Sequence, residues 1–426
     1  MQIIHETPYL VHPLDCAVGP GSSAMSLVVK GTFKMKLDGA AEAVSEPPEM
    51  RGDETYMDDL GRSLAYSSDL LPYKPRGEVI VNANCHPPEG RARPECDVAI
   101  QVGPIRKALR VTGDRRWSKG SPPVATAPLA FQSMPIRWER AFGSLTSPAN
   151  PLGRGVDVGT VPGDDGVYLP NVEYPGLRVT SPQDRPTPAG FGAIAQHWEP
   201  RLKRSGTRDQ RWAAFRAPLP PTDCEARAAN AAPDDQQLED GQYFRGDETL
   251  VLENLHRGFA RFTSALPGKR LRAFLWMRPT RTEPERFAEI DLKLDTVFID
   301  AEKEELTLVW RRPVQLDAPT EVAIEAIYLT EESTAVAPSP AEVHVARFLE
   351  LRPKEDPVDQ QKEIDEQMAE VHKLLSGPGM DPALAKAAKA EKDPAKVLDL
   401  ILRGIADKAH EAEQLTAKLK AGQPLV

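Results

Sequence analysis

The chain has 426 residues, of which 40% are hydrophobic and 27% are charged, so it is long enough for two or three domains with a sizeable core. Its formal net charge of −10 and the lack of a clustered Lys/Arg stripe disfavour nucleic acid as a partner. The N-terminus lacks a charged segment followed by an apolar run, and no stretch approaches the ~18 apolar residues of a membrane helix. We therefore expect a soluble, cytoplasmic protein with no membrane partner.

Proline is frequent, with 41 residues, which opposes long helices and favours short strands joined by constrained turns. The first predicted strand covers residues 26–36, where apolar side chains alternate with a set that includes Lys30 and Thr32. These polar residues predict solvent or a loop over the second face of the strand. Further strands are predicted at 78–81, 97–102, 107–112, 271–277, 289–294, 296–299, 306–310 and 321–329, with a polar hairpin turn at 300–305. Such short runs are typical of antiparallel sheets.

The middle of the chain, residues 137–258, consists of short segments that combine Gly or Pro with charged or amide side chains. Proline fixes φ, glycine permits positive φ, and Asn or Asp can hydrogen-bond backbone groups that no strand ladder satisfies. We therefore predict a long stretch of ordered loops rather than disorder. The aromatic residues expected to pin these loops are Trp138, Phe142, Phe191, Trp198, Trp212 and Phe215.

The same region supplies the candidate motif and interface residues. Its aromatic side chains either pin loops when buried or act as interface anchors when exposed, and we favour burial for most of them. Its arginines are expected to brace loop carbonyls or carboxylates rather than to meet a ligand. The candidate residues are Trp138, Arg140, Phe142, Asn150, Arg154, Asn171, Glu173, Phe191, Arg201, Asn230, Asp235, Gln236, Arg245, Asp247 and Glu248.

One cluster of acidic residues keeps an enzymatic interpretation open. Carboxylates with a histidine could bind a hard divalent cation or share acid/base work. Nearby arginines favour the alternative that these carboxylates cap turns and form ion pairs, so we predict no cofactor, no metal and no catalytic residue. The cluster comprises Asp223, Asp234, Asp235, Asp247, Glu248, Glu253 and His256. The four cysteines are widely spaced, and the group Cys85, His86 and Cys96 lacks a fourth metal ligand nearby, which predicts reduced thiols.

The composition changes after a small-residue linker at 335–340. Beyond it, Asp-Pro pairs at 356–357, 381–382 and 393–394 predict three helix starts, because Asp caps free amides and Pro fits the first helical position. Two apolar stripes, beginning at Ile364 and Leu398, predict a helical hairpin or an arm on a partner. We therefore divide the chain into an N-terminal β-rich half (1–130), a central loop-rich region with a second β half (131–335) and a helical tail (341–426).

Several spaced motifs of the chain are similar to those of one known family. They are Arg-Trp-Glu-Arg-Ala-Phe-Gly at 137–143, Asn-Pro-Leu-Gly-Arg-Gly at 150–155, Leu-Pro-Asn-Val-Glu at 169–173, Pro-Ala-Gly-Phe-Gly at 188–192, Asn-Ala-Ala-Pro-Asp-Asp-Gln at 230–236 and Arg-Gly-Asp-Glu at 245–248. An acidic turn after residue 52, the Ser-Asp-Leu segment at 68–75 and Gly-Asp-Arg-Arg-Trp at 113–117 fit as well. With these motifs, residues 1–330 resemble a proteobacterial family of domain-of-unknown-function proteins encoded beside the VgrG spike and PAAR tip components of type VI secretion systems.

The resemblance implies a non-enzymatic adaptor or chaperone that binds an effector or a PAAR-like protein and loads it onto the VgrG spike. The residues alone leave two alternatives open, namely a metal-dependent hydrolase that uses the carboxylates of 223–256 and a β-sandwich module that binds a sugar or peptide ligand. For the fold we predict a mainly β protein of antiparallel sheets, in two sandwich-like halves with long ordered loops, and a C-terminal α-helical appendage.

Overall fold

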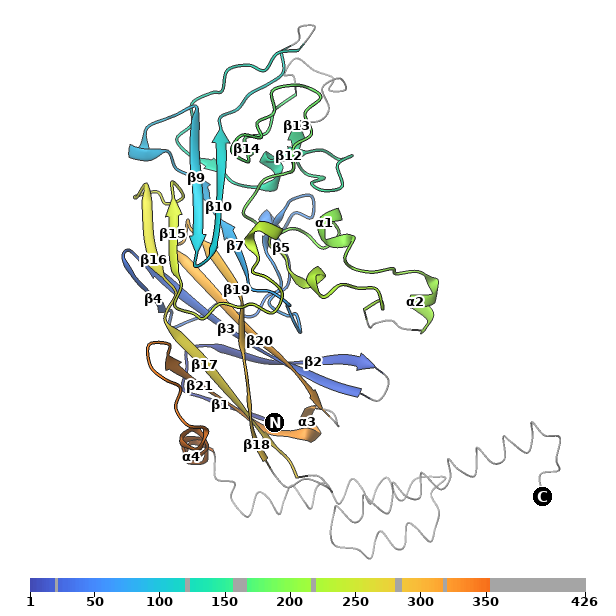
Figure 1. Cartoon of the computed structure of the whole chain (residues 1–426), viewed down its shortest axis with the longest axis vertical. Coiled ribbons are helices and arrows are strands. Elements are labelled where there is room, and N and C mark those ends of the chain that lie inside the picture. Colours follow the sequence, from blue (N-terminus) through green and yellow to red (C-terminus); the bar gives the residue numbers. More distant parts are fainter. Residues whose placement is uncertain are drawn as a thin grey trace, which may run out of the picture. The chain divides into compact units, whose positions relative to one another are not determined.

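A computed structural model of the chain describes residues 1–19, 22–118, 123–155, 167–215, 220–279, 286–316 and 320–352 (Figure 1). The chain divides into two compact units, Met1–Glu350 and Leu351–Val426, and almost all described residues belong to the first. The helix starts and apolar stripes predicted for the tail lie outside the described residues.

The first unit is built mainly from strands. In chain order these are β1 (Gln2–His5), β2 (Leu10–Gly19), β3 (Ser22–Lys36), β4 (Gly39–Ala43), β5 (Glu54–Thr55), β6 (Leu64–Tyr66), β7 (Glu78–Asn82), β8 (Asn84–Cys85), β9 (Glu95–Val102), β10 (Ile105–Thr112), β11 (Met134–Pro135), β12 (Phe142–Gly143), β13 (Arg154–Gly155), β14 (Val172–Glu173), β15 (Thr249–Glu253), β16 (Arg261–Ala265), β17 (Lys269–Met277), β18 (Arg286–Ile290), β19 (Lys293–Asp300), β20 (Glu305–Leu316) and β21 (Ile324–Ser333). The α-helices are α1 (Glu199–Leu202), α2 (Gln210–Phe215), α3 (Thr320–Ala323) and α4 (Ala341–Leu351), and the 3₁₀ turns are η1 (Tyr56–Asp58), η2 (Pro88–Gly90), η3 (Trp138–Arg140), η4 (Ala226–Ala229) and η5 (Asp234–Gln236).

An eleven-stranded sheet forms the centre of the unit, in the order β14-β10-β9-β15-β16-β4-β3-β20-β19-β7, with β2 also paired to β3. The unit consists mainly of strands, and most pairs in this sheet are antiparallel. Both observations confirm the predicted mainly β fold of antiparallel sheets. Strands from both sides of the predicted boundary at 130 alternate in this sheet, because β3 and β7 pair with β20 and β19. That boundary therefore does not separate two sheets.

A second sheet has the order β1-β21-β17-β18 and carries α4. Phe348 of α4 is fully buried, and its ring stacks on Trp276 at 5.1 Å between centroids. His344 is also buried and contacts Glu332 at 3.0 Å. The predicted tail boundary at 341 is therefore about one helix too early, because the aromatic face of this sheet needs α4 as its cover.

Two predicted strands have different limits in the structure. The stretch 289–294 spans the end of β18 and the start of β19, because the chain turns where Leu292 N donates to Ile290 O over 3.2 Å. The stretch 321–329 begins in α3, and its strand starts only at Ile324. Apolar periodicity alone does not locate such breaks, since buried residues stand on both sides of them.

The central region is largely irregular, as predicted, with two-residue strands and single helical turns. Its last part is different, because β15 pairs with both β9 and β16 inside the main sheet. Trp138, Phe142, Phe191 and Trp198 are buried, which confirms them as loop pins. The prediction was wrong for the other two aromatic residues: Trp212 is partly exposed and Phe215 is 87% exposed, because α2 stands out from the strands (Figure 1).

Both faces of β3 are covered, and its polar face meets the loop at 49–72. Lys30 is completely buried, and its Nζ donates to Glu49 O over 2.7 Å and to Asp69 Oδ2 over 2.9 Å. Ser26 Oγ donates to Pro72 O over 2.6 Å. The sequence left solvent and a loop as alternatives for this face, and the structure has the loop.

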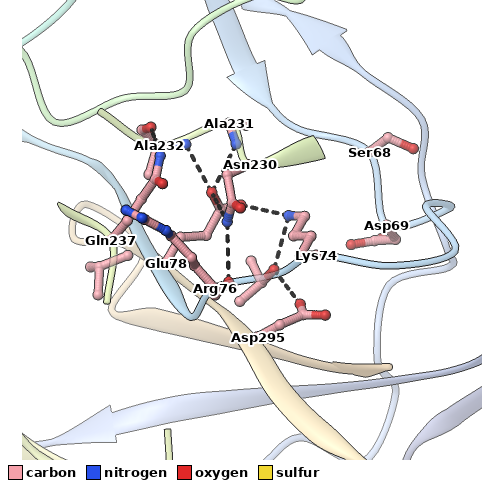
Figure 2. Close-up of polar contacts among 12 residues, drawn as sticks. Ser68, Asp69, Lys74, Arg76, Glu78, Asn230, Ala231, Ala232, Gln237 and Asp295 are labelled. Carbon is pink, nitrogen blue, oxygen red and sulfur yellow. Dashed lines mark hydrogen bonds and ion pairs between the residues drawn. The ribbon is translucent and has the colours of Figure 1, made fainter. Parts of the chain in front are cut away.

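Lys30 begins a row of buried charges that crosses the main sheet. Arg311 Nη2 donates to the carbonyl of Asp69 over 2.8 Å, and the same guanidinium forms an ion pair with Asp295. The row continues through Thr296, whose Oγ1 donates to Asp295 over 2.7 Å and accepts from Lys74 Nζ over 2.9 Å. Lys74 then pairs with Glu78 at 2.5 Å. We call the set Lys30, Asp69, Arg311, Asp295, Lys74 and Glu78 the buried charge row; each of its side chains is at most 2% exposed, and Figure 2 shows its Lys74 end.

The buried charge row predicts a large stability difference between two lysines of one strand. Lys30→Met leaves Asp69 buried without its cation and should lower the free energy of unfolding by about 3–5 kcal/mol. Lys34→Met, four residues along β3, removes an ion pair whose lysine is 49% exposed, and should cost less than about 1 kcal/mol. Urea unfolding of the full chain measures both. Equal losses in the two variants would show that the row does not stabilise the fold.

Candidate functional site

A cleft of about 560 Å³ opens in the central region between α1, η5 and the loop at 174–188. Such a volume is typical of ligand and peptide sites. Its lining combines apolar side chains with charged and polar side chains. The apolar lining includes Trp138, Leu177, Pro188, Ile194 and Pro233, and the polar lining includes Tyr174, Glu199, Arg201, Lys203, Arg204, Asp234 and Asp235. We call this feature the central cleft.

Trp138 forms part of the floor and is fixed on all sides. Its indole Nε1 donates to Ala193 O over 2.9 Å, and its ring meets Trp198 edge to face at 6.0 Å. A Cβ at Gly190 would lie 3.3 Å from the Trp138 ring, so a larger residue there would crowd the indole. The carbonyl of Trp138 accepts from Asn150 Nδ2 over 2.8 Å. Trp138 is therefore a rigid part of the site.

Arg201 of α1 is buried behind the cleft wall. Its Nη1 donates to Ile194 O over 2.8 Å, and its Nη2 donates to Ala228 O over 3.0 Å. These two carbonyls belong to separate loops that no strand ladder joins. Arg201 therefore braces loop carbonyls, as the sequence predicted, and ties both loops to α1.

A second buried cation, Lys107 on β10, supports η5 and the loop at 188–192, both of which contribute residues to the cleft lining. Its Nζ donates to Gly190 O over 2.7 Å, to Asp235 Oδ1 over 2.8 Å and to Gln236 Oε1 over 2.9 Å. Tyr174 OH donates to the other oxygen of Asp235 over 2.9 Å. Burial lowers the pKa of Lys107 to about 8, although the carboxylate of Asp235 acts in the opposite direction.

Gln236 and Phe191 complete this support. Gln236 Nε2 donates to Val79 O over 2.7 Å and to Phe191 O over 2.9 Å, which joins η5 to β7 and to the loop at 188–192. The ammonium of Lys107 lies 5.9 Å from the centre of the buried Phe191 ring. All three donors of Lys107 and the amide of Gln236 thus serve the loops around the central cleft.

The end of the buried charge row contacts Asn230, Ala231 and Ala232, as Figure 2 shows. Glu78 Oε2 accepts from Asn230 Nδ2 over 3.1 Å, from Ala231 N over 2.8 Å and from Ala232 N over 3.0 Å. Burial alone would raise the pKa of Glu78, but Lys74 and these donors hold it below its usual range. Ala232 lines the cleft. By accepting from the backbone amides of Ala231 and Ala232, the Glu78 carboxylate therefore fixes the position of this part of the lining.

A second group of predicted residues braces the loops beside the cleft. Asn171 Oδ1 accepts from Arg140 over 3.0 Å, and Asn171 Nδ2 donates to Thr112 O over 2.9 Å. Glu173 forms a buried ion pair with Arg115 at 2.8 Å. Arg154 donates to Glu139 O over 3.1 Å. Phe142 is buried with Leu169 and Val179, and its carbonyl accepts from Asn150 Nδ2 over 3.1 Å.

Arg245, Asp247 and Glu248 lie apart from the central cleft. Arg245 and Asp247 form an ion pair at 3.1 Å and line a separate cleft of about 480 Å³. Glu248 closes its own turn by accepting from Arg245 N over 2.7 Å and Gly246 N over 3.0 Å. Of the predicted residues, the structure therefore brings together Trp138, Arg201 and Asp235 as lining, and Asn150, Phe191, Asn230 and Gln236 as direct supports.

The acidic cluster 223–256 is dispersed among different partners. Asp223 accepts from Thr207, Asp234 pairs with Arg204 at 2.7 Å, Glu253 pairs with Arg261, and His256 contacts Glu304 at 3.0 Å. In the ranges that the structure describes, no group of three or more His, Cys, Asp or Glu side chains is placed to hold a metal ion. Cys85 and Cys96 are buried free thiols.

Sequence reasoning missed Lys107, Lys74 and Glu78. A usable signal exists for Lys107, because it stands between Ile105 and Leu109 on the core-facing positions of an alternating strand. A charged residue at such a position needs a buried partner. No comparable signal identifies Tyr174, whose partner Asp235 is 61 positions away in the sequence. Lys74 is only four residues from Glu78, but it stands in an irregular segment where no periodicity places its side chain.

Fold and site together define a mainly β protein whose loops form a braced cleft beside a large sheet. A family model described as "Uncharacterized protein conserved in bacteria (DUF2169)" matches residues 20–311, and the chain belongs to this family. The match covers the central cleft and the buried charge row. The chain has no significant match among curated proteins or among solved structures. Within the described part of the chain, no helix has the length and apolar character to span a bilayer.

The depressed pKa of Lys107 predicts a specific pH dependence of stability. Between about pH 8 and the ordinary lysine pKa near 10.5, the unfolded chain holds this proton and the folded chain does not. This group should therefore stabilise the protein increasingly as pH rises through that window, by at most ~1.4 kcal/mol per pH unit. Urea unfolding at several pH values measures the free energy of unfolding of wild type and of Lys107→Met. Subtracting one from the other removes the contribution of the other titrating groups, which both proteins share. A flat difference from pH 7 to pH 10 would contradict the assignment.

Proposed function

We propose that this protein is a non-enzymatic adaptor or chaperone that binds an effector, or the PAAR-like protein carrying it, and loads it onto the VgrG spike of a type VI secretion system. It acts in the cytoplasm, before export of its cargo. The proposal rests on the spaced motifs described above and on the build of the central cleft.

The observation that best supports a binding role is that the charges around the cleft are already engaged within the protein. Asp234 is held by Arg204, and Asp235 is held by Lys107 and Tyr174. Arg201 donates to the carbonyls of Ile194 and Ala228. A surface fixed in this way loses little conformational entropy on binding, so more of the contact energy appears as affinity. A cleft whose lining combines apolar surface with fixed charges suits a short apolar segment of a cargo protein.

The volume of the central cleft also fits a small ligand, which keeps the ligand-binding module as the second candidate. The two functions differ in their consequences for the cell. A cargo adaptor is required for the level or delivery of another protein, whereas a ligand-binding module is not.

The adaptor function predicts that deletion of the gene depletes the neighbouring effector. A chaperone that binds only folded cargo raises the apparent stability of that cargo by mass action, so cargo is lost in its absence. Immunoblotting measures the cellular level of the effector and its presence on the isolated spike. Wild-type levels of both in the deletion strain, with secretion continuing, would overturn the proposal.

Complementation of the deletion strain locates the binding surface. Leu177 lines the cleft and is 52% exposed, so Leu177→Arg should leave the fold intact but fail to restore the effector level. Leu129→Arg is the matched control, because Leu129 is 67% exposed and does not line the cleft. Equal rescue by both variants would move cargo binding away from the central cleft.

A further inference from the structure

One exposed segment begins at the lining of the central cleft and extends beyond it. The chain leaves the cleft at Lys203 and Arg204 and continues to the end of α2. We call residues 203–215 the basic arm. Figure 1 shows α2 at the outer end of this segment, away from the strands of the sheet. Phe215 at its end is 87% exposed, which is unusual for an aromatic side chain of this size.

The basic arm carries positive charge on an acidic protein. It contains four cationic residues, Lys203, Arg204, Arg208 and Arg211, and one anionic residue, Asp209, whereas the whole chain has a net charge of −10. Two of the cations are paired at the base of the arm, Lys203 with Glu199 and Arg204 with Asp234. Asp209 is used locally, because its Oδ1 accepts from Trp212 N over 2.8 Å. Arg208 lies 5.6 Å from the Trp212 ring centre. Among the described residues, neither Arg208 nor Arg211 forms an ion pair, so both charges are available at the surface.

The base of the basic arm is fixed. Thr207 donates to Asp223 from its backbone N over 3.0 Å and from its hydroxyl over 2.8 Å. Glu225 N donates to Arg204 O over 2.9 Å. Gly206 has φ +74°, and a Cβ there would lie 2.7 Å from Asp223 Oδ1, so the turn that directs the arm outward needs glycine. These hydrogen bonds fix the point and the direction at which the arm leaves the cleft.

We propose that the basic arm, together with the adjoining rim of the central cleft, docks a partner protein through an apolar surface flanked by Asp and Glu side chains. This inference rests on the proposed adaptor function and identifies the chemistry of its cargo. Exposed Phe and Arg side chains next to an apolar cleft match the composition of interface hot spots. Complementary charge would steer a carboxylate-flanked segment to the arm. Nucleic acid and anionic lipid are disfavoured, because they bind extended clusters of Lys and Arg, whereas the arm presents Arg208 and Arg211 as its two cations without an ion pair in the described part of the chain.

Titration of the purified full-length chain with the neighbouring effector or PAAR-like protein tests the inference. Arg208→Glu/Arg211→Glu and Phe215→Ser should each raise the Kd by about tenfold or more, because each removes part of the proposed hot spot. The matched controls are Arg91→Glu/Arg257→Glu, in which both arginines are at least 77% exposed, and Leu60→Ser, in which the leucine is 92% exposed. The controls should bind like wild type. Added salt should weaken wild-type binding more than binding by the double arginine variant.

A peptide array that tiles the same partner gives a second readout. The peptides retained by wild type should combine apolar residues with Asp or Glu, and the arm variants should lose them. Wild-type affinity in the arm variants would overturn the inference while leaving the adaptor function intact. No binding by the wild-type chain to the neighbouring proteins would count against the adaptor function itself. Arm-dependent binding of an oligothymidylate or of phosphatidylglycerol vesicles, without partner binding, would replace a protein partner with nucleic acid or membrane.

Discussion

The buried charge row is the constraint on which the remaining structure depends. It begins with Lys30 on β3, passes Asp295 and Arg311 on two further strands, and ends with Glu78 at the backbone amides of the cleft wall. Removing water from so many charges costs free energy that apolar side chains would not cost, and each charge is tolerable only while its partner is present. The row therefore fixes the position of the loops that carry Asp69 and Lys74 relative to the main sheet. The part of the cleft lining that Glu78 holds is fixed to the same sheet.

The central region shows how a long irregular segment can remain ordered. Without strand ladders, its backbone carbonyls and amides need other partners, since an unpaired buried polar group is costly. Side chains supply them, since Asn150, Arg201 and Gln236 each donate to two carbonyls. The carbonyls that accept from Arg201 and from Gln236 come from segments distant in the sequence. This explains why these loops are rich in amide and guanidinium groups.

The sequence was sufficient for most strands and for the character of the central loops, because both follow from local patterns. The alternation along β3 and the Gly and Pro segments after Arg137 are visible without coordinates. Partner choice was not predictable, since Lys30 meets a residue 39 positions away and Lys107 meets one 128 positions away. The central cleft was missed for the same reason. The exposure of Phe215 was not predicted, because the sequence does not distinguish an aromatic side chain that is buried from one that is exposed.

The pairing of β3 with β20 has a consequence for synthesis of the chain. Residues 23–34 of β3 pair with residues 305–316 of β20. One edge of β3 therefore stays unpaired until almost three hundred further residues have been synthesised. During that interval the nascent chain has an apolar strand with an open edge, which is a template for unwanted pairing. Asp295 and Arg311 are also synthesised late. The ion pair between them and the hydrogen bond from Arg311 to the Asp69 carbonyl can therefore form only at that stage. The family match begins just before β3 and ends at residue 311, inside β20. It therefore contains the whole of the chain that separates these two paired strands.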